Sequence, residues 1–487
     1  MESRPRFFFF SLLFLASAAF ASAHIADFDE YWQKKAEVAR SKAHNYYNPD
    51  PESVTRHFNE AVYEYVSSPL SSSASSIIPR MHASGAGEKR HKERPSVPGL
   101  CFGDICRDAE TNVTRRGLRG NKRSHGPCLA TNPIDRCWRC NENWIHHRKQ
   151  LATCAKGFGR HTTGGKNGKF YVVTDASDND LVNPKKGTLR YGVIQDRPLW
   201  IVFAHDMIIR LTEELLVNSD KTIDGRGANV QIMGGAGVTI QFVHNVIIHN
   251  LHIQDIKAGN GGMIRDSEQH YGLRTRSDGD GISIYGSSNI WIDHVSMSNC
   301  MDGLIDAIEG STAITISNSH FTRHNEVMLF GASDSYSPDA MMQITVAFNH
   351  FGKGLVQRMP RCRWGFVHVV NNDYTHWEMY AVGGSQHPTI ISQGNRYIAP
   401  SNLFAKEVTK RDYAAESVWK QWTWRSEGDL MLNGAFFVKS GGGGGLQKYD
   451  KTDIIKAKPG SFLGRYYMEL NGVGLQLGTQ RWTVGFR

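Results

Sequence analysis

The sequence predicts an all-β chain whose strands stack as successive coils of a β-solenoid. A seven-residue pattern recurs along it, as IIHNLHI, WIDHVSM, TISNSHF, TVAFNHF, HVVNNDY and ISQGNRY, starting at residues 247, 291, 315, 345, 368 and 391. These starts differ by 44, 24, 30, 23 and 23 residues. A short period of 23 to 24 residues, with two longer steps that loops can absorb, is typical of stacked coils.

Side chains that repeat within the pattern are the second observation. The fifth column holds Asn349, Asn372 and Asn395, whose amides could bond from coil to coil. The last column predicts a stacked aromatic row, made of Phe321, Phe351, Tyr374 and Tyr397. An antiparallel β-sandwich is the alternative fold, but it does not require asparagines in register with aromatic residues.

The first residues are typical of a secretory signal peptide, at 1–23. Arg4 and Arg6 precede an apolar run that ends in the small residues ASA, a cleavage pattern. The run is too short to favour the alternative of a membrane anchor. Eight cysteines, an even number, fit an oxidising compartment. We therefore expect a secreted, extracellular protein with no membrane contact after signal removal.

The rest of the chain divides by composition. Residues 24–66 are expected to be helical, because Asp50 can cap a helix whose apolar residues recur every three or four positions. Residues 67–130 are serine-rich and then basic, as in a linker. The solenoid is expected over 131–425, and residues 426–487 are expected to form a C-terminal arm that packs on it.

The formal net charge of +9 indicates an acidic partner. For a secreted protein, an anionic polysaccharide fits better than nucleic acid. A monomer is expected.

Four aspartates lie within or shortly after the stretch SDGDGISIYG, at residues 277–286. Asp278 and Asp280 lie within it, and Asp302 and Asp306 follow one coil later. Neighbouring strands are about 4.8 Å apart, so a step of 24 residues should place Asp302 beside Asp278. Such a cluster suits Ca²⁺, which prefers oxygen ligands. A simple turn is the alternative for DGD alone, and the EF-hand pattern is absent.

A basic motif, QRMPRCR, should stand beside this column. A step of 24 leads from Asp302 to Glu326, and the next step of 30 leads to position 356, two residues before Arg358. Arg361 and Arg363 follow it. Guanidinium groups bind carboxylates bidentately, which suits a polyanion. Salt bridges to the aspartates are the alternative role.

Carboxylates, a cation and arginines on one face suggest β-elimination on a uronic acid polymer. A metal ion that binds the substrate carboxylate would acidify the proton on the adjacent carbon. Arginine is normally charged and is an unusual base. It could act as one only beside other positive charges, and activity would then favour alkaline pH.

From about residue 131 to 425 the chain resembles plant-type pectate lyases, which are right-handed parallel β-helix enzymes. The motifs that carry the resemblance are NPIDRCWRC, KTIDGRG, SDGDGISIYGSSNIWIDH, DGLIDA and VQRMPRCR. The resemblance implies calcium-dependent cleavage of de-esterified (1→4)-α-D-galacturonan, giving 4,5-unsaturated oligogalacturonides during pectin degradation in the cell wall. It also implies a set of Ca²⁺ ligands, Asp278, Asp302 and Asp306, with Asp280 either as a further ligand or as a group that supports the ligands.

The resemblance implies Arg358 as the proton-abstracting base and Arg363, with Arg361, as a binding partner of the polygalacturonate substrate. It suggests a Cys137–Cys154 disulfide. Two residues depart from the family pattern. Asp302 stands where bacterial relatives use glutamate, and Glu326 stands where many relatives have lysine.

Three other functions compete with the lyase. A polygalacturonase-type hydrolase would need paired catalytic carboxylates, usually in NTD and GHG segments, which are absent. A pectin lyase normally lacks the calcium aspartates. A catalytically weakened pectate-binding cell-wall protein on the same fold is the third, and Glu326 is the feature that favours it.

Overall fold

The computed structural model describes residues 29–67, 128, 130–411 and 414–441 of the 487-residue chain. The expected signal peptide, most of the expected linker and the expected arm beyond residue 441 lie outside these ranges. Described residues up to Val66 and from Ala130 onward belong to one compact unit. None of the helices described is long and apolar enough to cross a membrane.

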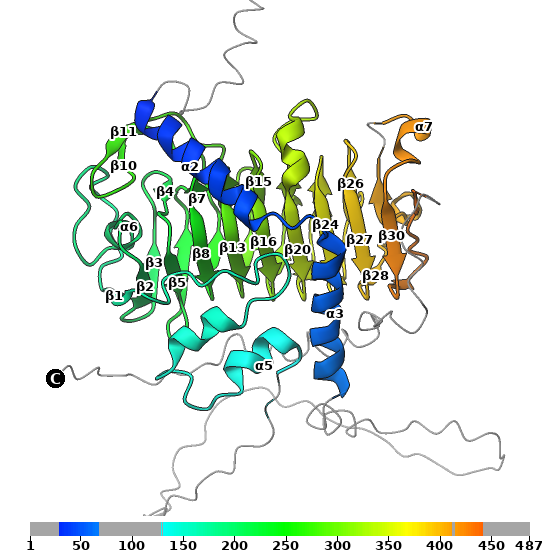
Figure 1. Cartoon of the computed structure of the whole chain (residues 1–487), viewed down its shortest axis with the longest axis horizontal. Coiled ribbons are helices and arrows are strands. Elements are labelled where there is room, and N and C mark those ends of the chain that lie inside the picture. The colour runs from blue at the N-terminus through cyan, green and yellow to red at the C-terminus, as the bar shows by residue number, and fades with distance from the viewer. Residues whose placement is uncertain (1–28, 68–127, 129, 412–413, 442–487) are drawn as a thin grey trace, which may run out of the picture. The chain divides into compact units, whose positions relative to one another are not determined.

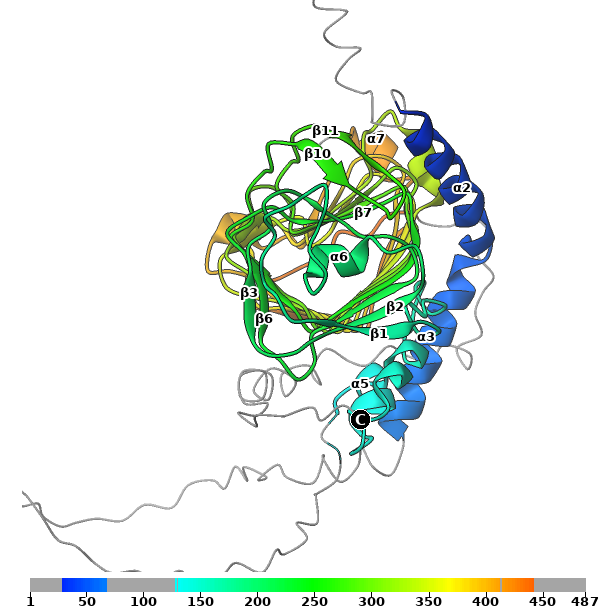
Figure 2. The ribbon, with the colours of Figure 1, turned by 90° about the vertical axis from the view of Figure 1, so that its left-hand side faces the viewer.

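Three parallel sheets, A, B and C, wind around an apolar interior (Figures 1 and 2). Sheet A contains β1 (Lys169–Val173), β2 (Leu199–Phe203), β5 (Lys221–Asp224), β8 (His244–His249), β13 (Ser288–Asp293), β16 (Thr312–Ser317), β20 (Gln343–Ala347), β24 (Phe366–Val370), β27 (Thr389–Gln393) and β30 (Trp424–Glu427). Sheet B contains β3 (Met207–Ile209), β6 (Val230–Met233), β9 (His252–Gln254), β14 (Ser296–Ser298), β17 (His320–Thr322), β21 (His350–Phe351), β25 (Asp373–Tyr374), β28 (Arg396–Ile398) and β31 (Leu430–Leu432). Sheet C contains β4 (Leu215–Leu216), β7 (Val238–Gln241), β12 (Ile282–Tyr285), β15 (Ile305–Ile308), β19 (Leu329–Phe330), β23 (Arg361–Cys362), β26 (Val382–Gly384) and β29 (Thr409–Lys410).

Each coil runs from sheet A to B to C, which confirms the predicted right-handed parallel β-helix. The starts of the seven-residue pattern are register partners in sheet A. Trp291 pairs with Ile247 on one side and with Thr315 on the other. His368 likewise pairs with Thr345 and with Ile391. The 23- and 24-residue steps are therefore single coils, and the two longer steps carry their extra residues in loops.

Both predicted ladders are present. The Nδ2 of Asn349 donates to Oδ1 of Asn372 at 3.1 Å, and Asn372 repeats this bond to Asn395 at 3.0 Å. The aromatic rings stack with centroids 4.5 to 5.3 Å apart, in the order Phe321, Phe351, Tyr374 and Tyr397. These side chains are buried, so the ladders tie each coil to the next from the inside.

The turns differ in how much variation they allow. The turn from sheet A to sheet B is tight and repeats a left-handed residue, such as Asn250, Asn318 or Asn371, with φ between 51° and 59°. Asparagine tolerates this conformation better than most residues. The turn from sheet B to sheet C varies in length and holds the larger loops, including the hairpin of β10 (Gly262–Arg265) and β11 (Tyr271–Arg274). It also holds the paired strands β18 (His324–Glu326) and β22 (Leu355–Gln357).

Helices cover one side of the coils (Figures 1 and 2). Helix α2 (Glu30–Tyr46) packs Trp32 against Phe242, at the turn from sheet C to sheet A. Helix α3 (Pro51–Ser67) begins after Asp50, whose Oδ1 accepts from the Ser53 amide at 3.2 Å, as predicted. The ring of its buried Phe58 lies 5.5 Å from that of Phe348.

Shorter helices complete the fold. Helix α6 (Leu189–Val193) closes the N-terminal end of the coils (Figure 2). Helix α5 (Pro133–Arg139) is joined to the segment after η2 (Arg148–Thr153) by the Cys137–Cys154 disulfide, which the resemblance had suggested. The other short helices in the described residues are η3 (Ser337–Met341), η4 (Leu403–Ala405) and α7 (Glu416–Trp419). The coils continue to β31, past the boundary expected at residue 425, because β30 and β31 still pair with β27 and β28.

Candidate active site

The turns from sheet B to sheet C bring the predicted site residues to one face. Asp278 and Asp280 lie just before β12, and Asp302 and Asp306 lie before and within β15. Glu326 ends β18, one coil further on, and Arg358 follows β22 in the next coil. Because β12, β15, β19 and β23 are neighbours in sheet C, these turns are stacked side by side.

The register differs slightly from the prediction. The step between β12 and β15 is 23 residues, not 24, because Ile282 pairs with Ile305. The Asp302 amide donates to the carbonyl of Gly279 at 3.2 Å, so Asp302 lies beside Gly279 rather than directly beside Asp278. The sheet A step of 24 does not hold in sheet C, since a turn in between absorbs one residue.

Two glycines make room for the carboxylates. Gly279, between Asp278 and Asp280, has φ of 103°, and a Cβ there would lie 2.7 Å from that of Met301. A Cβ at Gly303 would lie 2.2 Å from Oδ1 of Asp306. Both positions therefore need glycine, one for its backbone conformation and one for close approach.

The four aspartates interact electrostatically. Burial, with the charges of Asp302 and Asp278, raises the pKa of Asp280 to about 7. Burial and the Asp280 charge raise the pKa of Asp306 well above its ordinary value, although Arg358 opposes the shift. Partial burial and Asp302 also raise the pKa of Asp278. The fold thus holds these carboxylates together at a cost that a bound cation would offset.

The donor set fits a hard divalent cation. Oδ1 of Asp280 is buried and has no hydrogen-bond partner. One oxygen of Asp306 accepts from the Leu329 amide at 3.0 Å, which fixes that carboxylate. Carboxylate oxygens without a nitrogen or sulfur ligand suit Ca²⁺.

The arginines differ in how far they reach the face. Arg358 has φ of 63°, an uncommon conformation for a non-glycine residue, and its Nη2 lies 2.8 Å from Oε1 of Glu326. A basic residue beside the acidic column was predicted, and this contact confirms it. Nη1 of Arg363 donates to the Gly331 carbonyl at 2.7 Å. Arg361 is only 7% exposed and offers little surface to a polymer.

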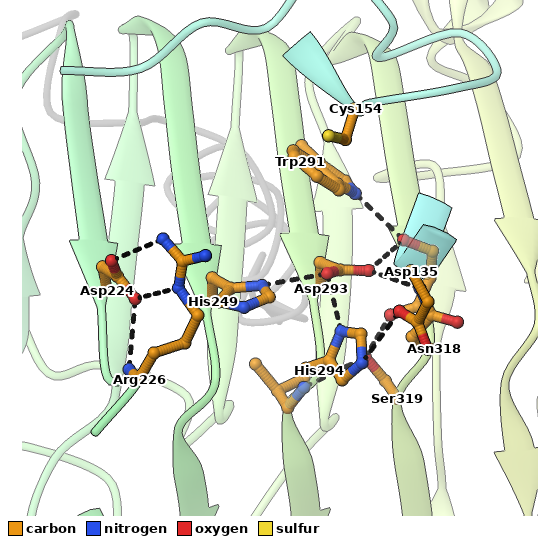
Figure 3. Close-up of polar contacts among 12 residues, drawn as sticks. Asp135, Cys154, Asp224, Arg226, His249, Trp291, Asp293, His294, Asn318 and Ser319 are labelled. Atoms are coloured by element: carbon orange, nitrogen blue, oxygen red, sulfur yellow. Dashed lines mark hydrogen bonds and ion pairs between the residues drawn. The ribbon is translucent and has the colours of Figure 1, made fainter. Parts of the chain in front are cut away.

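A second polar cluster lies under α5 (Figure 3). Nδ1 of His294 lies 2.7 Å from Asp293, and its Nε2 lies 3.2 Å from Asp135 of α5. His249 lies 2.9 Å from the same carboxylate of Asp293. Burial disfavours a charge on His294, but Asp293 and then Asp135 outweigh it and raise the pKa to about 10.

The ligand atoms of His249, Asp293 and His294 are close enough together to hold a metal ion. However, Asp293 already accepts from His294, and its other oxygen accepts from Ser317 and Asn318 at 2.6 and 2.9 Å. We therefore assign the cluster a structural role, as an ion pair that fastens α5 to sheet A. The WIDH motif marked Asp293 and His294, but no pattern linked them to Asp135.

Comparisons with known proteins place this geometry in a class. Residues 210–417 match the family model described as "Pectate lyase", and residues 24–118 match "Pectate lyase, N terminus". The crystal structure of jun a 1, the major allergen from cedar pollen, is 47% identical with a TM-score of 0.65, and the match covers 69% of this chain and 97% of that one. Fold and sequence together define a polysaccharide lyase built on a parallel β-helix.

Full-length relatives narrow the class to a family. A pectate lyase of Lilium longiflorum is 64% identical over 460 residues, covering 94% of this chain and 95% of that protein. "Probable pectate lyase P59" of Solanum lycopersicum is 57% identical over 454 residues, covering 93% of each. This chain belongs to the pectate lyase family.

Proposed function

We propose that this protein is a secreted, calcium-dependent pectate lyase that cleaves de-esterified galacturonan in the cell wall by β-elimination. The observation that carries the proposal is Oδ1 of Asp280, which is buried and has no hydrogen-bond partner among the described residues. It lies within the group of four aspartates, in the turn three coils before the turn that carries Arg358. Asp278, Asp302 and Asp306 would hold the ion with Asp280. Bound calcium would draw electrons from the uronate carboxylate and acidify the proton on the carbon beside it.

The chain's own residues would complete the reaction. Arg358 would take the proton from C5, and the electron pair of the broken C5–H bond would form the C4–C5 double bond. The glycosidic oxygen would leave from C4 with the electrons of the C4–O bond and take a proton from solvent. Arg363 would bind a substrate carboxylate, with its guanidinium held by Gly331. Arg361, being buried, would support this arrangement from behind. The 4,5-unsaturated product follows from this balance of bonds.

The contact between Glu326 and Arg358 favours a second candidate, a pectate-binding protein with little activity. The carboxylate neutralises the guanidinium that would act on the substrate, and both side chains are largely shielded, at 30% and 18% exposed. An elimination assay distinguishes the two functions.

The test is incubation of the purified protein with polygalacturonate at alkaline pH, with calcium or with a chelator, while ultraviolet absorbance of the unsaturated product is recorded. We expect absorbance that requires calcium, and a loss of roughly 100-fold or more in Arg358→Lys. Arg197→Lys, an exposed arginine in the first coils, is the matched control and should keep full activity. New reducing ends without absorbance would indicate hydrolysis, and binding without either signal would indicate the weakened protein.

A further inference from the structure

A cleft of about 530 Å³ lies on the same face as the aspartates, toward the N-terminal end of the coils. It is formed by turns from sheet B to sheet C, including Arg210 to Thr212, Gly234 to Ala236 and Lys257 to Asn260. The last of these turns touches the aspartate segment, because the Gly259 amide donates to Oγ of Ser277 at 2.7 Å. The cleft therefore continues the line of the candidate active site over the preceding coils.

Two basic side chains at this cleft are exposed to solvent. Arg210 and Lys257 are both exposed, and they come from turns of different coils. Neither side chain forms a hydrogen bond or ion pair with another residue in the described parts of the chain. Both charges are available to a ligand.

The acidic groups nearby do not cancel these charges. Asp178, which lines the cleft, accepts from Nε and Nη2 of Arg190 at 2.6 and 2.7 Å. Glu213, behind it, accepts from the amides of Asn260 and Gly261 at 3.1 and 3.0 Å. The acids are thus occupied by buried or backbone donors, and the accessible charge of the cleft is positive.

We propose that this cleft is a distal subsite that binds uronate units of the polymer several sugars away from the bond that is cleaved. Arg210 and Lys257 bind free carboxylates there, and Thr212 and Asn260 offer polar atoms to the hydroxyls. Gly234 lines the cleft, and a Cβ there would meet nothing within 4 Å, so this part of the cleft is open to a sugar ring. This inference rests on the proposed function. Such a subsite would make the enzyme prefer long galacturonan chains whose uronate units several sugars from the cleaved bond are not esterified.

The test compares wild type with Arg210→Ala/Lys257→Ala. The matched control is Lys169→Ala/Lys439→Ala, which removes two exposed positive charges away from the cleft. Two quantities are measured: the ratio of kcat/KM on polygalacturonate to kcat/KM on trigalacturonate, and the Kd for polygalacturonate by affinity electrophoresis. Fully methyl-esterified polymer is the neutral comparison ligand.

We expect the cleft variant to lower the ratio roughly five- to tenfold and to raise Kd by a similar factor, with the control unchanged. Binding of the esterified polymer should not change. An unchanged ratio and Kd, or an equal loss on polymer and trimer, would overturn the subsite, as would the same loss in the control. If wild type shows no elimination, the lyase proposal fails, and a selective rise in Kd would still uphold the cleft.

Discussion

The buried ion pair under α5 leads to a pH-dependent prediction for His294→Gln. The folded protein holds the His294 pKa at about 10, whereas an unfolded histidine titrates near 6.5. Between these values the folded state binds the extra proton, so the stability that His294 contributes is complete below pH 6.5 and is lost as pH rises toward 10. The slope is at most about 1.4 kcal/mol per pH unit. Breaking a buried pair costs about 3–5 kcal/mol, so the substitution should cost about that much near pH 6.

The pH dependence of wild-type stability does not isolate the contribution of His294, because other buried groups also change their protonation on unfolding. Burial lowers the pKa values of Lys35 and Lys221 to about 8, against an ordinary 10.5. The unfolded chain therefore binds more protons than the folded one between about pH 8 and 10.5, and these lysines raise stability with pH in that window. The useful quantity is the difference between wild type and His294→Gln, in which the lysine contributions cancel.

Urea denaturation followed by tryptophan fluorescence measures this difference from about pH 6 to pH 10. The calcium concentration must be held constant, since a ligand of the folded state adds stability. The destabilisation should be largest near pH 6 and small near pH 10. His205→Gln, at an exposed histidine, is the matched control and should show a small difference at every pH. A destabilisation by His294→Gln that does not change with pH would mean that His294 is neutral in the fold, and would refute the ion pair.

Three further substitutions test the site and the coils. Asp302→Asn should weaken calcium binding on the order of tenfold, because it removes one charged ligand, and calorimetry with CaCl₂ would show an unchanged Kd if Asp302 lies outside the site. Glu326→Gln should lower KM for polygalacturonate by roughly two- to fivefold, since it removes a negative charge 2.8 Å from Arg358, and a raised KM would instead mean that Glu326 positions the arginine. Asn372→Ala should destabilise the fold by about 1–3 kcal/mol, because the Val346 carbonyl that it bonds at 2.8 Å is buried, and a urea midpoint equal to wild type would contradict the ladder's role.

Sequence reasoning was accurate where the same side chain returns in every coil. Asn349, Asn372 and Asn395 lie in the turns that follow sheet A strands and indicate the register of those strands, because each amide must meet the next one at the coil spacing. Adding the same steps to Glu326 led to position 356, one residue short of its register partner Gln357 and two short of Arg358. The predicted register of sheet C was wrong by one residue at Asp302. That register depends on the length of a turn, and no side chain that repeats from coil to coil marks this length in the sequence.

Contacts between distant segments left no periodic signal. Asp135 and His294 are 159 residues apart, and nothing in either stretch marks the other as its partner. The cleft near Arg210 and Lys257 was missed for the same reason, since its charge depends on which acids are already bonded to Arg190 or to backbone amides. Such features require the folded coordinates.

The outer face of sheet A has a consequence for how the molecule would tolerate cutting. In β13, Ile290 and Ile292 face the interior, yet the outward Trp291 is equally buried, beneath helices from the two sides of the undescribed stretch at 68–127. Phe58 and Ile134 belong to that same outer apolar cluster. A protease that cut the chain within this stretch would produce two fragments that stay associated. The helices on both sides of the cut pack against the same apolar outer surface of sheet A.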